Sequence, residues 1–183
     1  MKVLVLNCGS SSVKFQLIET DPELMEKGEE KVLAKGLVER IGEPMGNLKY
    51  SATCREPLSI QAPVPRHQEA IEKILSLLTD AEHGVVKSVD EIEVVGHRMV
   101  HGGEEFKASV IIDEEVLAQI EKCSRLAPLH NPHNIRGYLA SRETISAVPH
   151  VAVFDTAFHQ SMPKYAYLYA LPYEMYTEHG IRR

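Results

Sequence analysis

The sequence contains no tryptophan and only three cysteines in 183 residues. Cys8, Cys54 and Cys123 are odd in number and far apart, and no two of them form a Cys-x-x-Cys pair. This spacing is not typical of a disulfide framework or a zinc ribbon. It favours reduced thiols in a cytoplasmic protein, and we expect each cysteine to be buried and chemically quiet.

The sequence also lacks any apolar run long enough to span a bilayer. The apolar start, Met1–Leu6, is short and leads into a polar Gly- and Ser-rich stretch without a cleavage pattern, so it predicts a strand and not a signal peptide. Basic residues are not in excess, because the net charge is −6 and the pI is about 5.8. Nothing therefore indicates a nucleic-acid surface, although a local site for an anionic substrate is compatible with this charge.

The first third of the sequence has the composition of β-strands separated by Gly, Pro and charged residues. The polar segment Asp21–Glu30 between them predicts a loop. The predicted strands cover Val3–Cys8, Val13–Ile18, Val32–Ile41, Asn47–Thr53 and Pro57–Gln61.

After Ala62–Pro65 the apolar period becomes helical, with one face formed by Ile71, Ile74, Leu75 and Leu78. Strands that precede helices alternating with strands predict an α/β domain with a mixed sheet over residues 1–155. The Tyr- and Pro-rich segment 156–183 is expected to begin a second domain that continues beyond Arg183. The later predicted elements are a strand over Glu91–Gly96, a helix capped by Asp113, a helix starting at Asn131–Pro132 and a strand over Val151–Phe154.

The first motif that can carry chemistry is Asn7–Lys14, with the sequence NCGSSSVK. Glycine allows a tight turn, and hydroxyl and backbone N–H groups can cradle phosphate oxygens beside the positive charge of Lys14. The motif is not a Walker A loop, because it lacks the second glycine and a following helix. A plain polar hairpin turn is the alternative.

The second motif is Gly96–Glu104, with the sequence GHRMVHGGE, which we expect directly after a strand. Ligands on α/β sheets bind at the carboxyl ends of strands, and Arg98 can hold a carboxylate or phosphate with two parallel hydrogen bonds. A surface salt bridge is the alternative interpretation of this arginine.

The third motif is Leu126–Asn134, with the sequence LAPLHNPHN, at a predicted helix start. A helix N-terminus favours anions, and His130 can donate a hydrogen bond to one. A loop histidine with an ordinary hydrogen bond remains the alternative.

The fourth motif is Phe154–His159, with the sequence FDTAFH, which places Asp155 at the carboxyl end of a buried strand. A charge in that position requires a partner, so Asp155 is a candidate for a catalytic group or a metal partner. The alternative is an aspartate that caps the following turn.

Nine histidines also raise the possibility of a zinc hydrolase. Its candidate ligands are His97 with His101 and His130 with His133. Neither pair has the His-Glu-x-x-His helix pattern, and prolines and glycines interrupt both.

Together and in this order, the segments VLVLNCGSSSVKF, GHRMVHGGE, LAPLHNPHN and VFDTAFHQSMP resemble the signatures of the acetate kinase family. The resemblance runs from Met1 to Arg183. It implies an actin-like, ribonuclease H-like ATPase domain and reversible phosphoryl transfer from ATP to acetate, with Mg²⁺ or Mn²⁺. It also implies a cytoplasmic homodimer when the protein is full length, with no nucleic-acid or membrane partner.

On the nucleotide side, the resemblance implies that Asn7 lies near the metal ion. Ser10 and Ser12 would lie near the phosphates, and Lys14 would contact a phosphate of ATP.

On the acceptor side, the resemblance implies that Arg98 holds the substrate carboxylate, with Val100 and Leu129 around its methyl group. His130 would stabilise the transferring phosphoryl group, and Asp155 would be the catalytic aspartate.

The sequence departs from the family pattern in one respect, because the family's later motifs for adenosine, a second arginine and a metal-binding glutamate are absent. The chain alone is therefore expected to be inactive. Propionate kinase, butyrate kinase and a non-catalytic actin-like nucleotide-binding module are the alternative functions.

Overall fold

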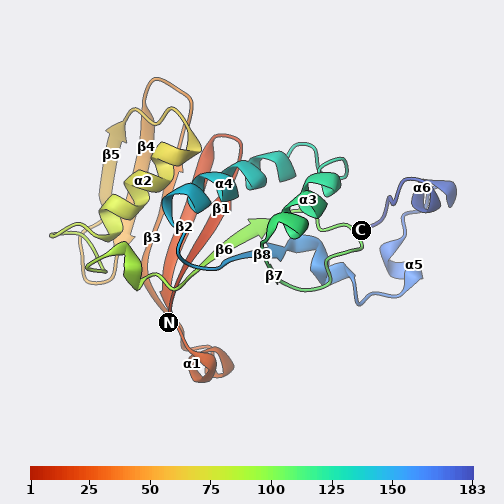
Figure 1. Cartoon of the computed structure of the whole chain (residues 1–183), viewed down its shortest axis with the longest axis horizontal. Helices are drawn as coiled ribbons and strands as arrows, with labels where there is room; N and C mark the ends of the chain where they lie inside the picture. The colour runs from red at the N-terminus through yellow and green to blue at the C-terminus, as the bar shows by residue number, and fades with distance from the viewer.

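A computed structural model describes all residues from Met1 to Arg183. Its centre is one eight-stranded sheet in the order β5-β4-β3-β2-β1-β6-β8-β7 (Figure 1). Strands β1, β6 and β8 run parallel to one another and every other neighbouring pair is antiparallel, so the predicted mixed sheet is confirmed. The strands are β1 (Lys2–Cys8), β2 (Ser12–Glu19), β3 (Lys31–Glu39), β4 (Gly46–Ala52), β5 (Leu58–Ala62), β6 (Val94–Met99), β7 (Val110–Ile111) and β8 (His150–Phe154).

Helices α2, α3 and α4 pack on one face of this sheet, whereas α1 projects away from it near the N-terminus and α5 and α6 lie together at the end of the molecule far from β5 (Figure 1). None of the helices combines the length and apolar character that a membrane span requires. The helices are α1 (Pro22–Lys27), α2 (His67–Leu78), α3 (Glu114–Cys123), α4 (Asn131–Thr144), α5 (Lys164–Tyr167) and α6 (Glu174–Thr177), with short 3₁₀ segments η1 (Val89–Glu91) and η2 (Asp155–His159).

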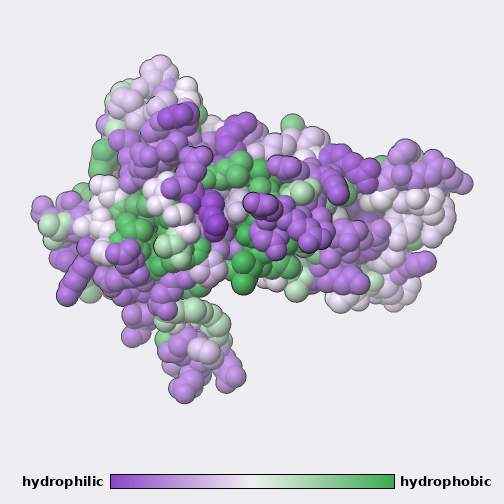
Figure 2. Space-filling view, viewed as in Figure 1, coloured by the Kyte–Doolittle hydropathy of each residue, from purple (hydrophilic) through white to green (hydrophobic).

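The alternation of side chains along the strands separates the two faces of the sheet. In β1, Leu4, Leu6 and Cys8 are buried beneath the helices, whereas Val5 and Asn7 point to the other face and are only partly buried. Burial of a leucine side chain contributes about 1.5–3 kcal/mol, so the helix-covered face supplies the core. Figure 2 shows apolar residues gathered near the centre of the viewed face, while the projecting ends are hydrophilic.

The caps of two helices follow the sequence signals. The side chain of Asp113 accepts a hydrogen bond of 2.8 Å from the Val116 N–H at the start of α3. Helix α4 begins at Asn131 with Pro132 in its first turn. Both predicted helix starts are confirmed: Asp113 satisfies a backbone N–H group that α3 leaves free, and Pro132 lies in the first turn of α4, where its missing N–H costs no helix hydrogen bond.

The loop predicted over Asp21–Glu30 is wrong, because this segment contains α1. Asp21 accepts a hydrogen bond from the Leu24 N–H, Pro22 occupies the first turn, and Gly28 ends the helix with a left-handed φ of 65°. No residue of α1 is buried, so hydrophobic periodicity gave no signal and only the capping residues specify the helix.

The strand predicted over Glu91–Gly96 is displaced, because β6 covers Val94–Met99. The second motif therefore starts within the strand, and Arg98 belongs to the strand itself. The polar residues of this strand do not give the apolar pattern of a buried strand. His97 is nevertheless almost fully buried, where its ring is satisfied by a hydrogen bond to His150. The short elements β7, η2, α5 and α6 were not predicted.

The cysteine expectation is correct for two of the three thiols. Cys8 and Cys123 are buried, and burial raises the pKa of Cys8 to about 12. Cys54 is exposed, which contradicts the expectation, because it lies in the turn after β4 with a φ of 61°.

Candidate active site

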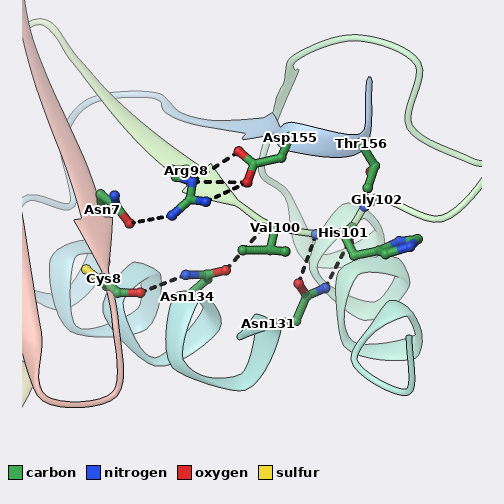
Figure 3. A network of polar contacts seen from close by, with 10 residues as sticks. All are labelled: Asn7, Cys8, Arg98, Val100, His101, Gly102, Asn131, Asn134, Asp155 and Thr156. Atoms are coloured by element: carbon green, nitrogen blue, oxygen red, sulfur yellow. Dashed lines mark hydrogen bonds and ion pairs between the residues drawn. The ribbon is translucent and has the colours of Figure 1, made fainter. Parts of the chain in front are cut away.

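Three polar side chains meet near the carboxyl ends of the parallel strands β1, β6 and β8 (Figure 3). Arg98 Nε donates to Asp155 Oδ1 at 3.0 Å, and Arg98 Nη2 donates to Asp155 Oδ2 at 2.6 Å. The third guanidinium nitrogen, Nη1, donates to Asn7 Oδ1 at 3.3 Å. Residues 7, 98 and 155 are therefore brought together by the parallel register, as ligand sites on α/β sheets require.

The ion pair between Arg98 and Asp155 is half exposed, with 46% and 43% of the two side chains accessible. The hydrogen bonds that Arg98 donates to the Asp155 carboxylate raise the pKa of Arg98 above its ordinary value. A pair this exposed contributes only about 0–1 kcal/mol to folding, so its main consequence is a positioned guanidinium facing solvent. Asp155 does not cap the turn that follows it, because its hydrogen bonds all come from Arg98.

The hairpin between β1 and β2 adjoins this group. The turn is closed by a hydrogen bond of 2.8 Å from the Gly9 N–H to the Ser12 carbonyl, and Ser10 is exposed at its tip. Lys14 pairs with Asn7 in the antiparallel register and makes no ion pair within the protein. The Ser10 hydroxyl group thus lies at the tip of the turn, and Ser12 and the free ammonium group of Lys14 lie on the strand next to Asn7.

Two buried asparagines that were not predicted hold the strand ends in place (Figure 3). Asn134 donates to the Cys8 carbonyl at 2.7 Å and accepts from the Val100 N–H at 3.2 Å. Asn131 accepts from the His101 N–H at 3.0 Å and donates to the His101 carbonyl at 2.8 Å. Their spacing of three residues at a helix start was the available signal, because it places both amides on one side of α4.

The remaining predicted site residues lie around the start of α4. His130 is exposed at the N-cap position, and its ring makes no hydrogen bond within the protein. Leu129 is 78% exposed and Val100 is partly buried, so these two side chains do not enclose a ligand in this chain. No hydrogen bond or ion pair joins Leu129 or His130 to the Arg98–Asp155 pair.

The oxygen atoms at this edge have the chemistry that Mg²⁺ prefers, because Asp155 supplies a carboxylate and Asn7 an amide oxygen. Both already accept hydrogen bonds from Arg98. They fit a Mg²⁺ ion that keeps several water ligands and is held mainly by phosphate oxygens, and they do not form an all-protein cage.

In the first histidine pair considered for zinc, both rings have other partners. His97 Nε2 lies 2.9 Å from His150 Nδ1, and His101 Nδ1 accepts from the Gly103 N–H at 3.0 Å. No group of three or more His, Cys, Asp or Glu side chains is arranged to hold a metal ion. The geometry therefore contradicts His97 and His101 as a ligand pair.

Comparison with curated proteins relates the chain to acetate kinases along its whole length. It is 53% identical to the acetate kinase of Parabacteroides distasonis and 54% identical to that of Caldanaerobacter subterraneus subsp. tengcongensis. Each match covers 100% of this chain and 44% of the relative. The chain thus spans less than half the length of the curated relatives that it matches.

Solved structures give the same result. The Porphyromonas gingivalis acetate kinase matches with a TM-score of 0.90 and 49% identity, covering 100% of this chain and 44% of that one. A propionate kinase from Francisella tularensis matches over the same shares with a TM-score of 0.84 and 38% identity. The predicted actin-like ATPase fold is therefore confirmed.

The family model described as "Acetokinase family" matches residues 2–183. This match covers all four motifs. It also covers α1 and β6, the two elements for which the prediction from sequence was wrong or displaced. The chain belongs to the acetokinase family.

Proposed function

We propose that this chain supplies the acceptor-binding and phosphate-binding part of an acetate kinase, which converts ATP and acetate reversibly into ADP and acetyl phosphate. The observation that carries the proposal is the guanidinium of Arg98, held by Asp155 and Asn7 beside a Ser-rich hairpin. If Arg98 binds a carboxylate and the hairpin binds phosphate, the two groups are neighbours, as transfer between them requires.

Arg98 is proposed to bind the carboxylate of acetate. Its planar guanidinium matches a carboxylate with two parallel hydrogen bonds, which a lysine cannot reproduce. Asp155 already holds the guanidinium through Nε and Nη2, so the arginine is oriented before a substrate arrives. Val100 and Leu129 are proposed to contact the methyl group of acetate.

Asp155 is proposed to act by charge and not as a general base. Acetate is already ionised at neutral pH, so there is no substrate proton to remove. The carboxylate orients Arg98 and contributes a fixed negative charge at the point where a metal–phosphate group would approach. Positioning and charge stabilisation account for most of the rate in phosphoryl transfer.

The phosphate groups of ATP are proposed to contact Ser10, Ser12 and Lys14, with Asn7 near the metal ion. His130, at the start of α4, is proposed to donate a hydrogen bond to the transferring phosphoryl group. Bound Mg²⁺ would neutralise phosphate charge during transfer.

We further propose that residues 1–155 form the acceptor domain and that 156–183 begin a second domain. The relatives are more than twice as long as this chain, and phosphoryl transfer depends on a water-poor cleft that closes around both substrates. The chain alone is therefore expected to show no acetate-dependent ADP formation, and the full-length protein is expected to be a homodimer.

Propionate kinase is the second candidate function. It is favoured by the match to the Francisella tularensis propionate kinase, although the identity of 38% is lower than the 49% found for the Porphyromonas gingivalis acetate kinase. One methylene group is worth only about 1–3 kcal/mol of discrimination, so both acids should react at different rates.

The experiment is a coupled assay of ADP formation with a chimera. Residues 1–183 of this chain replace the matching 44% of the Porphyromonas gingivalis acetate kinase. The chimera should form ADP with ATP, Mg²⁺ and acetate, faster than with propionate or butyrate. A folded chimera that hydrolyses ATP equally well without any carboxylate would contradict the proposal and favour the non-catalytic nucleotide-binding alternative.

A further inference from the structure

The hairpin between β1 and β2 is fixed from behind by groups distant in the sequence. The Cys8 carbonyl accepts from the Asn134 amide at 2.7 Å, and the Gly9 carbonyl bonds to His67 Nε2 at 2.7 Å. The Ser11 carbonyl accepts from the Ile41 N–H at 3.0 Å. Three carbonyl oxygens of one short turn are thus engaged by the protein behind it.

At the tip of the turn the backbone N–H groups, by contrast, are left free. The backbone N–H groups of Ser10 and Ser11 donate to no acceptor within the protein, and Ser10 is exposed. A loop that binds an anion must present N–H groups and keep its carbonyl oxygens away, because a carbonyl oxygen repels phosphate. The hydrogen bonds on the carbonyl side therefore decide what the loop can bind.

His67 is the unusual member of this set. It is the first residue of α2, only 4% of it is exposed, and it lies 58 residues from Gly9 in the sequence. A carbonyl oxygen can only accept, so Nε2 of the ring must carry the hydrogen atom. A cavity of about 470 Å³ adjoins the ring and the turn, lined in part by Ser10 and Arg136, so a shorter side chain would admit water there.

We infer that His67 is a positioning residue for phosphate binding: its hydrogen bond to the Gly9 carbonyl turns the N–H group of Ser10, which lies in the same peptide plane, outward beside the free N–H group of Ser11. This inference rests on the proposed function, because it assumes that the hairpin binds phosphate. It adds a residue outside the four sequence motifs to the phosphate site. The role of His67 is separate from that of Arg98, which contacts the acceptor.

The ring assignment is tested in the wild-type chain by nitrogen NMR of the histidine side chains. His67 should carry its proton on Nε2, with Nδ1 unprotonated at neutral pH. A His67 ring protonated only on Nδ1 cannot donate to Gly9 and would overturn the inference without any variant.

The functional test uses two variants of matched length. His67→Gln keeps an N–H donor near the position of Nε2, whereas His67→Met has no donor. Inorganic pyrophosphate is titrated into each ¹⁵N-labelled chain while the amide signals of Ser10 and Ser11 are followed. His67→Met should raise the Kd for pyrophosphate about tenfold, which corresponds to the loss of one good hydrogen bond, and His67→Gln should stay within about threefold of wild type.

Three results would decide against the inference. Equal pyrophosphate affinity in His67→Met and wild type, with the former less stable, would make His67 merely structural. Equal weakening in both variants would assign the effect to packing. If pyrophosphate does not shift the Ser10 and Ser11 amide signals of the wild-type chain, the hairpin does not bind phosphate, and that part of the proposed function fails together with the inference. This result therefore differs from a failure of the His67 role alone, in which wild type still binds pyrophosphate.

The chimera supplies an independent readout. His67→Met should raise the KM for ATP about tenfold and leave the KM for acetate unchanged, because Arg98 binds acetate. His67→Gln should restore the KM for ATP. An equal rise in both KM values would contradict a specific role in phosphate binding.

Discussion

Neighbouring residues of β6, His97 and Arg98, show how differently the two faces of this sheet are used. His97 points toward the helices, is almost fully buried, and pairs with His150 of β8 at 2.9 Å. Arg98 points to the other face, is half exposed, and pairs with Asp155, which follows β8. One pair of strands therefore carries a structural contact on one face and the candidate chemical contact on the other.

The buried pair has a defined proton arrangement. His150 Nε2 donates to the Ile145 carbonyl at 2.7 Å, so His150 Nδ1 must accept a hydrogen from His97 Nε2. The two rings are nearly parallel, with an interplanar angle of 13° and centroids 5.1 Å apart, and Tyr138 of α4 packs edge-on against both. Burial lowers the pKa of His97 to about 3 and also lowers that of His150, so both rings are neutral at pH 7.

The largest effect is expected for the charge of Asp155. In the chimera, Asp155→Asn should reduce kcat by about 10²–10³, the usual cost of removing one electrostatic group from a transition-state site. The midpoint of thermal unfolding should hardly change, because the ion pair is exposed. His97→Gln is the matched control on the other face and should lower stability while kcat persists. Near-normal kcat in Asp155→Asn would make its pair with Arg98 a surface salt bridge.

The second effect concerns the guanidinium. Arg98→Ala in the chimera should raise the KM for acetate about 100-fold, because about 2–5 kcal/mol is lost when one partner of a hydrogen-bonded charge pair is removed. The kcat value at saturating acetate should change much less. Arg98→Lys should not restore the KM, since an ammonium group cannot grip a carboxylate with two parallel bonds. An unchanged KM for acetate would show that Arg98 is structural.

The third effect is a pH dependence of stability that is expected from the buried His97–His150 pair and not from the exposed Arg98–Asp155 pair. In the unfolded chain His97 becomes protonated below about pH 6.5, whereas in the folded chain its pKa is lowered to about 3. The unfolded state therefore binds more protons between these pH values, so the free energy of unfolding should fall as the pH falls through this window. Each such histidine contributes a slope of up to about 1.4 kcal/mol per pH unit. Urea unfolding of the chain at pH 7.0, 6.0 and 5.0 measures it. The double variant with His97→Gln and His150→Gln should show a smaller slope, and an unchanged slope would contradict the assignment.

The smallest effect is expected just beyond β6, where Val100 is only partly buried. In the chimera, Val100→Ala should reduce the preference for acetate over propionate by several-fold, within the range of about 1–3 kcal/mol per methylene group. The ratio of the two kcat/KM values measures this preference. Leu139→Ala, on the exposed side of α4, is the control and should leave the ratio unchanged. An equal ratio in both variants would remove Val100 from the acetate site.

Local signals in the sequence were sufficient for much of the fold. A β-rich run predicted β1, alternating residues predicted β2, and the period of the apolar residues predicted α2. Asp113 and Asn131 marked two helix starts. These local signals did not predict an element correctly where the burial of a residue depends on a partner far away in the sequence. The strand β6 was misplaced because His97 looks polar until His150 lies beside it.

The candidate site divides in the same way. The motifs predicted candidate chemical groups, because a guanidinium, a carboxylate and a Gly-Ser turn are recognisable without coordinates. The supporting roles of Asn131, Asn134 and His67 were missed, since each bonds a backbone carbonyl far away in the sequence. The spacing of the two asparagines was the one local signal, and His67 had none.

The sequence by itself determined the family, the mixed α/β class and the identities of Arg98 and Asp155 as polar residues near strand ends. Only the tertiary structure decided that the two side chains pair with each other, and that His97 faces the opposite side. The reason is physical: side-chain type and spacing are encoded locally, whereas the parallel register of β1, β6 and β8 joins segments more than fifty residues apart.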